Sequence, residues 1–185
     1  HLTAFTSKGY NGKDIIMQGD LLHVDFGITY LRLNTDIQEH AYVLKPNETN
    51  APSYLQKAME TGNRLQDILT GHFQENKTGN QILASALAQA KKETINATIY
   101  THPIGAHGHA AGPTIGMWDM QEGVPGTGDF PMHLKTAYSI ELNAAIEIKE
   151  WKKTIRIMLE QDGYFDENGF RYIGGRQTKL HLVGN

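Results

Sequence analysis

The sequence of 185 residues predicts an α+β fold in which an antiparallel sheet is backed by helices. Two runs with strand character stand near the N-terminus, two runs with helical periodicity follow, and several strand-like runs finish the chain. Strands and helices segregated in this way are typical of antiparallel sheets with helices on one face. The sequence has no internal repeat, low-complexity segment or linker, so we expect one domain over residues 1–185.

The first strand pair contains two aspartates. Asp25 lies in an apolar run over residues 20–29, which predicts a mostly buried strand, and Asp36 opens a second run over residues 36–44. The segment between them is short enough to reverse the chain, so the strands would pair antiparallel with the carboxylates side by side. Carboxylates that share a buried site repel each other, and a divalent cation commonly keeps both ionised. The alternative is two strand-end aspartates that face solvent.

Two helices are expected in the middle of the chain. From Pro52 to Phe73, apolar residues recur at three- and four-residue steps, which predicts an amphipathic helix of roughly 22 residues. A second helix is expected from about Gly79 to Ile95, with Thr78 as its N-cap.

Residues 102–133 are irregular and rich in Gly, His and Pro. Long loops inside compact domains often carry functional sites. Three of the nine histidines, His102, His107 and His109, lie within eight positions of this segment. A single histidine is more often a hydrogen-bonded structural residue, but imidazole is also the commonest neutral metal ligand. The cluster therefore favours a metal or catalytic site.

The strand-like runs that finish the chain contain two glutamates of interest. We expect these strands over residues 137–142, 145–148, 154–160 and 170–173. Glu141 stands within the first of them, and a charged residue is rarely buried without a partner. The alternative is an edge-strand glutamate whose carboxylate lies in water. Glu160 shares a strand face with Met158, because residues two apart in a strand point the same way.

The composition excludes several classes of protein and site. The chain has no cysteine, so disulfides, thiolate metal sites and cysteine nucleophiles are ruled out. The formal net charge of -3 argues against a nucleic-acid partner or a membrane surface. No apolar run approaches the roughly 20 residues that a membrane-spanning helix needs. We therefore expect a soluble protein, with the cytoplasm slightly favoured.

The candidate metal ligands are rich in oxygen and include one imidazole: Asp25, Asp36, His109, Glu141 and Glu160. Such a set suits Mn, Co, Fe or Zn in a two-metal hydrolytic site better than it suits a structural zinc.

These residues, in this order, resemble the pita-bread metallopeptidases, which include methionine aminopeptidase, aminopeptidase P, prolidase and the non-peptidase creatinase. The resemblance rests on an Asp in Val-Asp-Phe-Gly, a second Asp eleven residues later, a His in His-x-x-Gly, a Glu in a strand and a closing Arg-Ile-x-x-Glu strand. It covers residues 19–183 and is strongest for the Xaa-Pro peptidase branch. The family's catalytic domain is longer at its N-terminus by a pair of helices, so this chain looks like the C-terminal part of a longer protein.

The resemblance implies a role for each residue. Asp25 would chelate one metal and Asp36 would bridge both. His109 and Glu141 would bind the other metal, and Glu160 would have to supply the second bridge. The two cations would generate a bridging hydroxide that attacks a peptide carbonyl. His109 is preferred to His107 because it keeps the His-x-x-Gly spacing.

The sequence departs from the family pattern at positions that bear on catalysis. The last bridging glutamate normally follows the Arg-Ile pair directly, but Met158 stands there, and a thioether is a poor ligand for hard cations. Glu160 would reach the site only through a bulge or a register shift, which moves it roughly 6–7 Å along the strand. The catalytic histidine expected after the ligand histidine has no counterpart in residues 115–119. An upstream substrate-binding histidine, expected before the first strand, has no match either, and His40 and His102 could substitute for it. Together with His107, they are the candidate catalytic histidines.

The leading interpretation is a metal-dependent exopeptidase of the Xaa-Pro aminopeptidase or prolidase type with a peptide substrate. One alternative is a pita-bread domain that has lost catalysis and serves as a binding module. Another is a metal-free hydrolase of the creatinase type. The sequence leaves open whether the chain forms a homodimer.

Overall fold

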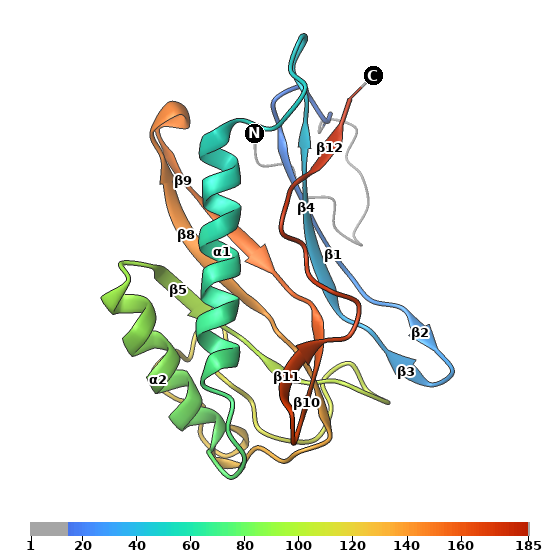
Figure 1. The fold of residues 1–185 in the computed structure, drawn as a ribbon, viewed down its shortest axis with the longest axis vertical. Helices are drawn as coiled ribbons and strands as arrows, with labels where there is room; N and C mark the ends of the chain where they lie inside the picture. Colours follow the sequence, from blue (N-terminus) through green and yellow to red (C-terminus); the bar gives the residue numbers. More distant parts are fainter. Residues whose placement is uncertain (1–14, 185) are drawn as a thin grey trace.

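The computed structural model describes residues 15–184. In this part of the chain, three small sheets, a protruding hairpin and two α-helices make up the fold (Figure 1). The helices are α1 (Ser53–Gly71) and α2 (Gly79–Lys92), with short 3-10 turns at Thr127–Asp129 and Lys149–Trp151. The strands are β1 (Leu21–Phe26), β2 (Thr29–Tyr30), β3 (Leu33–Asn34), β4 (Ile37–Val43), β5 (Asn96–Ile99), β6 (His102–Pro103), β7 (Thr136–Ser139), β8 (Leu142–Ile148), β9 (Lys153–Leu159), β10 (Asp162–Asp166), β11 (Gly169–Tyr172) and β12 (His181–Val183).

The predicted strand pair around the two aspartates is confirmed. β1 and β4 run antiparallel with Asp25 opposite Gln38, and the β2–β3 hairpin occupies the reversal between them. The expectation that β1 is mostly buried is wrong, because its last four residues, 23–26, are exposed. β1 is an edge strand, since its partner among the described strands is β4 alone. β12 then pairs parallel with β4, so this sheet is not purely antiparallel.

Both predicted helices form, and each ends a few residues before the end of its apolar pattern. Thr78 caps α2 as expected, because its hydroxyl accepts from the Gln81 amide while the Gln81 side chain accepts from the Thr78 amide. α1 begins directly after Pro52, which has extended backbone angles.

The core lies between α1 and the sheet formed by β5, β8 and β9 (Figure 1). Gly62 of α1 allows this close approach, because a Cβ atom there would lie 2.8 Å from Ile157 and 3.0 Å from Leu159. Both of these β9 side chains are fully buried. The odd-numbered side chains of β9 therefore face the helix, and Arg156, Met158 and the following Glu160 point to the opposite side.

Three strands pass from this sheet into a second one through short breaks. β5 leads to β6 across residues 100–101, β7 leads to β8 across residues 140–141, and β9 leads to β10 across residues 160–161. The strand predicted over residues 137–142 is therefore divided into β7 and β8, with Glu141 at the break. The four-stranded sheet has the order β11-β10-β7-β6, so the three strands keep their neighbours across the bend.

Neither α-helix of the described residues is long and apolar enough to cross a lipid bilayer.

Candidate metal centre

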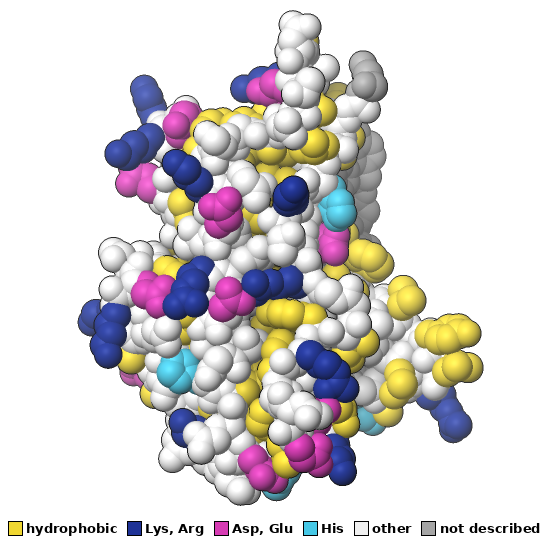
Figure 2. Space-filling model, in the orientation of Figure 1, with side chains coloured by type: hydrophobic (Ala, Val, Ile, Leu, Met, Phe, Trp, Pro, Cys, Tyr) yellow, Lys and Arg dark blue, Asp and Glu magenta, His cyan; other side chains and the backbone are white. Residues whose placement is uncertain are grey.

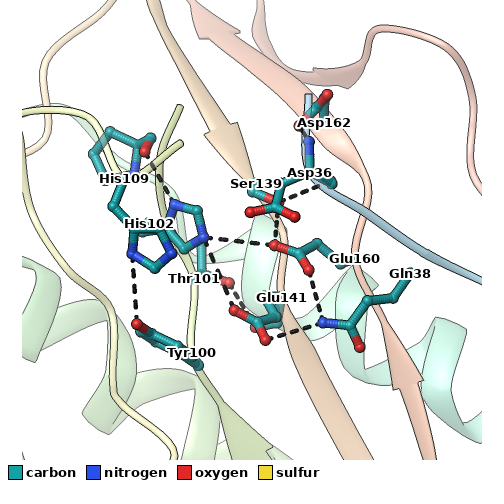
Figure 3. A network of polar contacts seen from close by, with 11 residues as sticks. Asp36, Gln38, Tyr100, Thr101, His102, His109, Ser139, Glu141, Glu160 and Asp162 are labelled. Carbon is teal, nitrogen blue, oxygen red and sulfur yellow. Dashed lines mark hydrogen bonds and ion pairs between the residues drawn. The ribbon is translucent and has the colours of Figure 1, made fainter. Parts of the chain in front are cut away.

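The bend between the two sheets brings three candidate ligands together. His102 follows the first break, Glu141 lies in the second, and Glu160 lies in the third. Hydrogen bonds tie the breaks to one another: Tyr100 and Thr101 both donate to the carbonyl of Glu141. Because the backbone at the breaks leaves the regular ladder, the side chains there turn toward a common point (Figure 3).

His102 has the features of a metal-binding imidazole. Its Nδ1 donates to the carbonyl of Pro103 at 3.0 Å, so in the neutral ring Nε2 carries a lone pair. That Nε2 is buried and has no hydrogen-bond partner. It faces Glu160 Oε1 at 3.5 Å and Glu141 Oε2 at 3.9 Å. A metal-bound histidine typically donates its other N–H to a carbonyl or carboxylate in this way.

Four carboxylates and two histidines form overlapping groups. Within each group, one ligand atom from every member lies within 4.8 Å of the others. The groups found among the described residues are Asp25–Asp36–Glu160, His102–Glu141–Glu160 and Asp36–His102–His109. Glu160 belongs to two of them, which is the geometry expected of a carboxylate that bridges two cations.

The carboxylates of these groups repel one another, and positive charge nearby would stabilise them. Burial, followed by the charge of Glu160, raises the pKa of Glu141 to about 8 and that of Asp36 to about 6. The same two causes raise the pKa of Asp25. None of the ion pairs found in residues 15–184 joins a Lys or Arg to these carboxylates. A divalent cation would supply the missing charge.

His102 partly compensates the negative charge, because it lowers the pKa of Glu141 and of Asp36. Burial lowers its pKa, but the nearby carboxylate of Glu160 outweighs that cost, so the pKa is raised overall.

Glu160 reaches the group without the bulge or register shift expected from the sequence. The β8–β9 register runs unbroken from Leu142 opposite Leu159 to Ile148 opposite Lys153. Glu160 is the residue directly after β9, it is 2% exposed, and it pairs with Gln38 of β4. Its Oε1 also accepts from the Ser139 hydroxyl at 2.7 Å. Met158 lies one pleat away, so it does not occupy the position of the bridging carboxylate.

Two histidines of the loop, His102 and His109, lie together. The rings of His102 and His109 are stacked, with centroids 3.8 Å apart and planes 11° from parallel (Figure 3). His102 is buried and faces the glutamates, whereas His109 is exposed and belongs only to the group with Asp36 and His102. The Tyr100 hydroxyl is 3.5 Å from His109 Nδ1. Burial and then His102 lower the pKa of His109. The site therefore holds two histidines, one enclosed and one open to solvent.

The other two candidate histidines lie outside these groups. His40 is buried, its Nε2 accepts from the Met158 amide at 3.0 Å, and its Nδ1 is 3.2 Å from the Leu22 carbonyl. His107 is exposed, and neither residue belongs to a candidate metal group of residues 15–184.

Sequence reasoning overlooked two polar residues of the site, Gln38 and Ser139. Gln38 stands two residues after Asp36, and residues two apart in a strand point the same way, so strand alternation could have predicted that Gln38 lies on the face of the site. Ser139 had no such signal, because the break at Glu141 disrupts the parity that would have related the two.

No protein-family model and no curated protein sequence matches this chain. Solved structures do match. An X-Pro aminopeptidase from Thermotoga maritima superposes with a TM-score of 0.68 at 18% identity, over 91% of this chain and 43% of that one. Dipeptidase PepE from Mycobacterium ulcerans gives 0.64 at 22% identity, over 92% and 42%. The N-terminal domain of FACT complex subunit SPT16 from chickpea gives 0.64 at 12% identity, over 90% and 38%.

The match covers less than half of each of these solved chains, although it covers nearly all of this one. The similarity in structure is high while identity is low, which is the behaviour of a shared fold. The chain therefore has the pita-bread fold of these solved proteins, as the resemblance in the sequence predicts.

Proposed function

We propose that this chain is a metal-dependent exopeptidase domain of the Xaa-Pro aminopeptidase or prolidase type. Its ligands would be Asp25, Asp36, His102, Glu141 and Glu160, which hold two divalent cations. The observation that carries the proposal is the buried, unpartnered Nε2 of His102, which faces two glutamate oxygens. A neutral lone pair opposite two carboxylates is unfavourable without a proton or a cation between them. Two of the solved proteins with this fold, an X-Pro aminopeptidase and a dipeptidase, support the same proposal.

The residues divide into two metal positions that share Glu160. His102 and Glu141 would complete one position, and Asp25 and Asp36 would complete the other. This assignment moves the ligand role from His109, which the spacing favours, to His102. The set of oxygens with one imidazole suits Mn, Co, Fe or Zn.

Bound cations would supply Lewis-acid activation of a water molecule and of the peptide carbonyl. The chain itself would orient the substrate. His109 lies on the open side of the group, where its exposed ring can donate a hydrogen bond to the carbonyl oxygen of a bound peptide. Ser139 and Gln38 keep Glu160 in place by donating to its two oxygens.

The first experiment is elemental analysis of the purified chain after incubation with Mn and removal of excess metal, with hydrolysis of Xaa-Pro dipeptides measured in parallel. We expect about two bound equivalents and turnover. His102→Asn should lower the metal content, whereas His109→Asn should retain metal and lose activity. His107→Asn is the matched control and should change neither. Retained metal in His102→Asn with loss in His109→Asn would restore the assignment favoured by the spacing.

Asp36→Asn tests the second position. The substitution preserves size and removes the charge, so it should lower metal content and abolish hydrolysis with little change in the circular dichroism spectrum. Unchanged metal content in this variant would contradict a two-metal site.

A catalytically inactive binding module is the second candidate. It is favoured by the match to the N-terminal domain of a FACT complex subunit at a TM-score of 0.64, since that protein is not described as a hydrolase. Absence of bound Mn together with absence of hydrolysis would decide for this candidate.

A further inference from the structure

Gln38 lies between the two glutamates of the site and uses both hydrogens of its amide on them (Figure 3). Its Nε2 donates to Glu160 Oε2 at 2.7 Å and to Glu141 Oε1 at 3.0 Å. The side chain is out of contact with bulk water, because Gln38 is 3% exposed. The backbone is fixed as well: the Gln38 amide donates to the Glu160 carbonyl, and the Gln161 side chain donates to the Gln38 carbonyl, both at 2.9 Å.

His23 of β1 fixes the orientation of this amide. Gln38 Oε1 lies 2.9 Å from His23 Nε2. An amide oxygen cannot donate, so His23 Nε2 carries the hydrogen of this bond. A flipped amide would place Oε1 against two carboxylates and turn the NH2 group toward a donor. The arrangement with His23 is therefore the favourable one.

Gln38 donates to one oxygen of each glutamate. The other two oxygens, Glu141 Oε2 and Glu160 Oε1, face His102 Nε2, and Glu160 Oε1 also accepts from the Ser139 hydroxyl. The second metal position lacks comparable support. Asp25 is exposed, and no described side chain or amide donates a hydrogen bond to the carboxylate of Asp25 or Asp36.

We propose that Gln38, oriented by His23, is a positioning residue that preforms the position made by His102, Glu141 and Glu160. This position then binds its cation first and more tightly than the Asp25–Asp36 position. The inference rests on the proposed metal-dependent function. Its physical basis is that ligands already held in place lose less conformational freedom when a cation binds, and that hydrogen bonds from neighbouring residues orient the ligands themselves.

The test is isothermal titration of the metal-free chain with Mn, followed by elemental analysis. The unaltered chain should bind in two steps of unequal affinity. Gln38→Leu should weaken the tighter step about 10–100-fold, the range typical for loss of a residue that supports a metal ligand. The weaker step should change less, because it shares only Glu160 with the tighter one, and Glu160 keeps its hydrogen bond from Ser139. His23→Phe should have a smaller effect of the same kind, and His23→Gln should recover part of it because it again offers a donor.

Asn63→Leu is the matched control. Asn63 is also buried, but its amide donates to the backbone carbonyl of Gln177 and to neither glutamate, so both binding steps should be unchanged. If Gln38→Leu does not fold, His23→Phe decides, because His23 is exposed. Equal titrations for the unaltered chain and the foldable variant would overturn the role of Gln38 and leave the metal function intact. No Mn binding by the unaltered chain would overturn both.

Discussion

The candidate metal centre takes ligands from the β5-β8-β9 sheet and from the β1-β4-β12 sheet, and these two sheets differ in what covers them. β8 and β9 lie under α1, and Ile157 and Leu159 on their helix-facing side are fully buried. β1 lies at the edge of the other sheet, where Val24 and Phe26 are 47% and 54% exposed. The ligands follow this division: Glu160 at the end of β9 is buried, whereas Asp25 on β1 is exposed. One site is therefore built from a rigid half and an open half.

The open half continues into the β2–β3 hairpin, which projects from the body with hydrophobic side chains on its surface (Figure 2). Tyr30, Leu31 and Leu33 are each more than 60% exposed. Leu31 and Arg32 at the turn have positive φ angles of 48° and 66°, a conformation that favours Gly or Asn. Ligands of the same chemical type can therefore differ in rigidity, because rigidity comes from the packing behind each ligand.

The largest expected effect on stability comes from removing the packing behind the rigid half. Leu159→Ala leaves a cavity beneath α1 and should cost about 2–5 kcal/mol of unfolding free energy, measured by urea denaturation of the metal-free chain. Mn affinity should also fall, because Glu160 is the next residue. A loss below about 1 kcal/mol would show that this half is not better packed than β1.

His40 joins the two halves, since it contacts Met158 of β9 and Leu22 of β1. Burial, and then His23, lowers its pKa from 6.5 to about 4. Between these values the unfolded chain binds a proton that the folded chain does not, so this contribution to stability is lost as the pH falls from 6.5 to 4. The loss is on the order of 3 kcal/mol at most.

We expect His40→Gln to flatten the fall in stability below pH 6.5 relative to the unaltered chain in urea titrations. The exposed His133→Gln is the control and should keep the original slope. Identical slopes for His40→Gln and the unaltered chain would mean that His40 does not form a buried neutral contact between the halves.

The smallest effect is expected on the open face. Val24→Thr keeps the shape and strand preference of the side chain and should change the unfolding free energy by less than about 0.5 kcal/mol. Ile157→Thr at a buried position provides the comparison. It should cost several times more, because it buries a hydroxyl and removes apolar volume from the core. Equal costs at the two positions would show that β1 is covered in solution.

Much of the fold could be predicted from local patterns. The periodicity of residues 52–73 and the capping box at Thr78 act within a few residues, so they identify both helices. The reversal between Asp25 and Asp36 is similarly short-range. β10 and β12 escaped prediction, because their residues show little alternation and they are held by pairing with distant strands.

Periodicity, capping and chemical type are properties of neighbouring residues, so the amino-acid sequence specifies the helices, the β1–β4 pair and the kinds of side chain available for a metal site. Three features of the site follow from tertiary contacts instead: which histidine faces the glutamates, how Glu160 reaches the site, and that Gln38 links Glu141 to Glu160. These depend on three strands that bend together at residues 100–101, 140–141 and 160–161, and the bend arises from contacts between segments far apart in the chain.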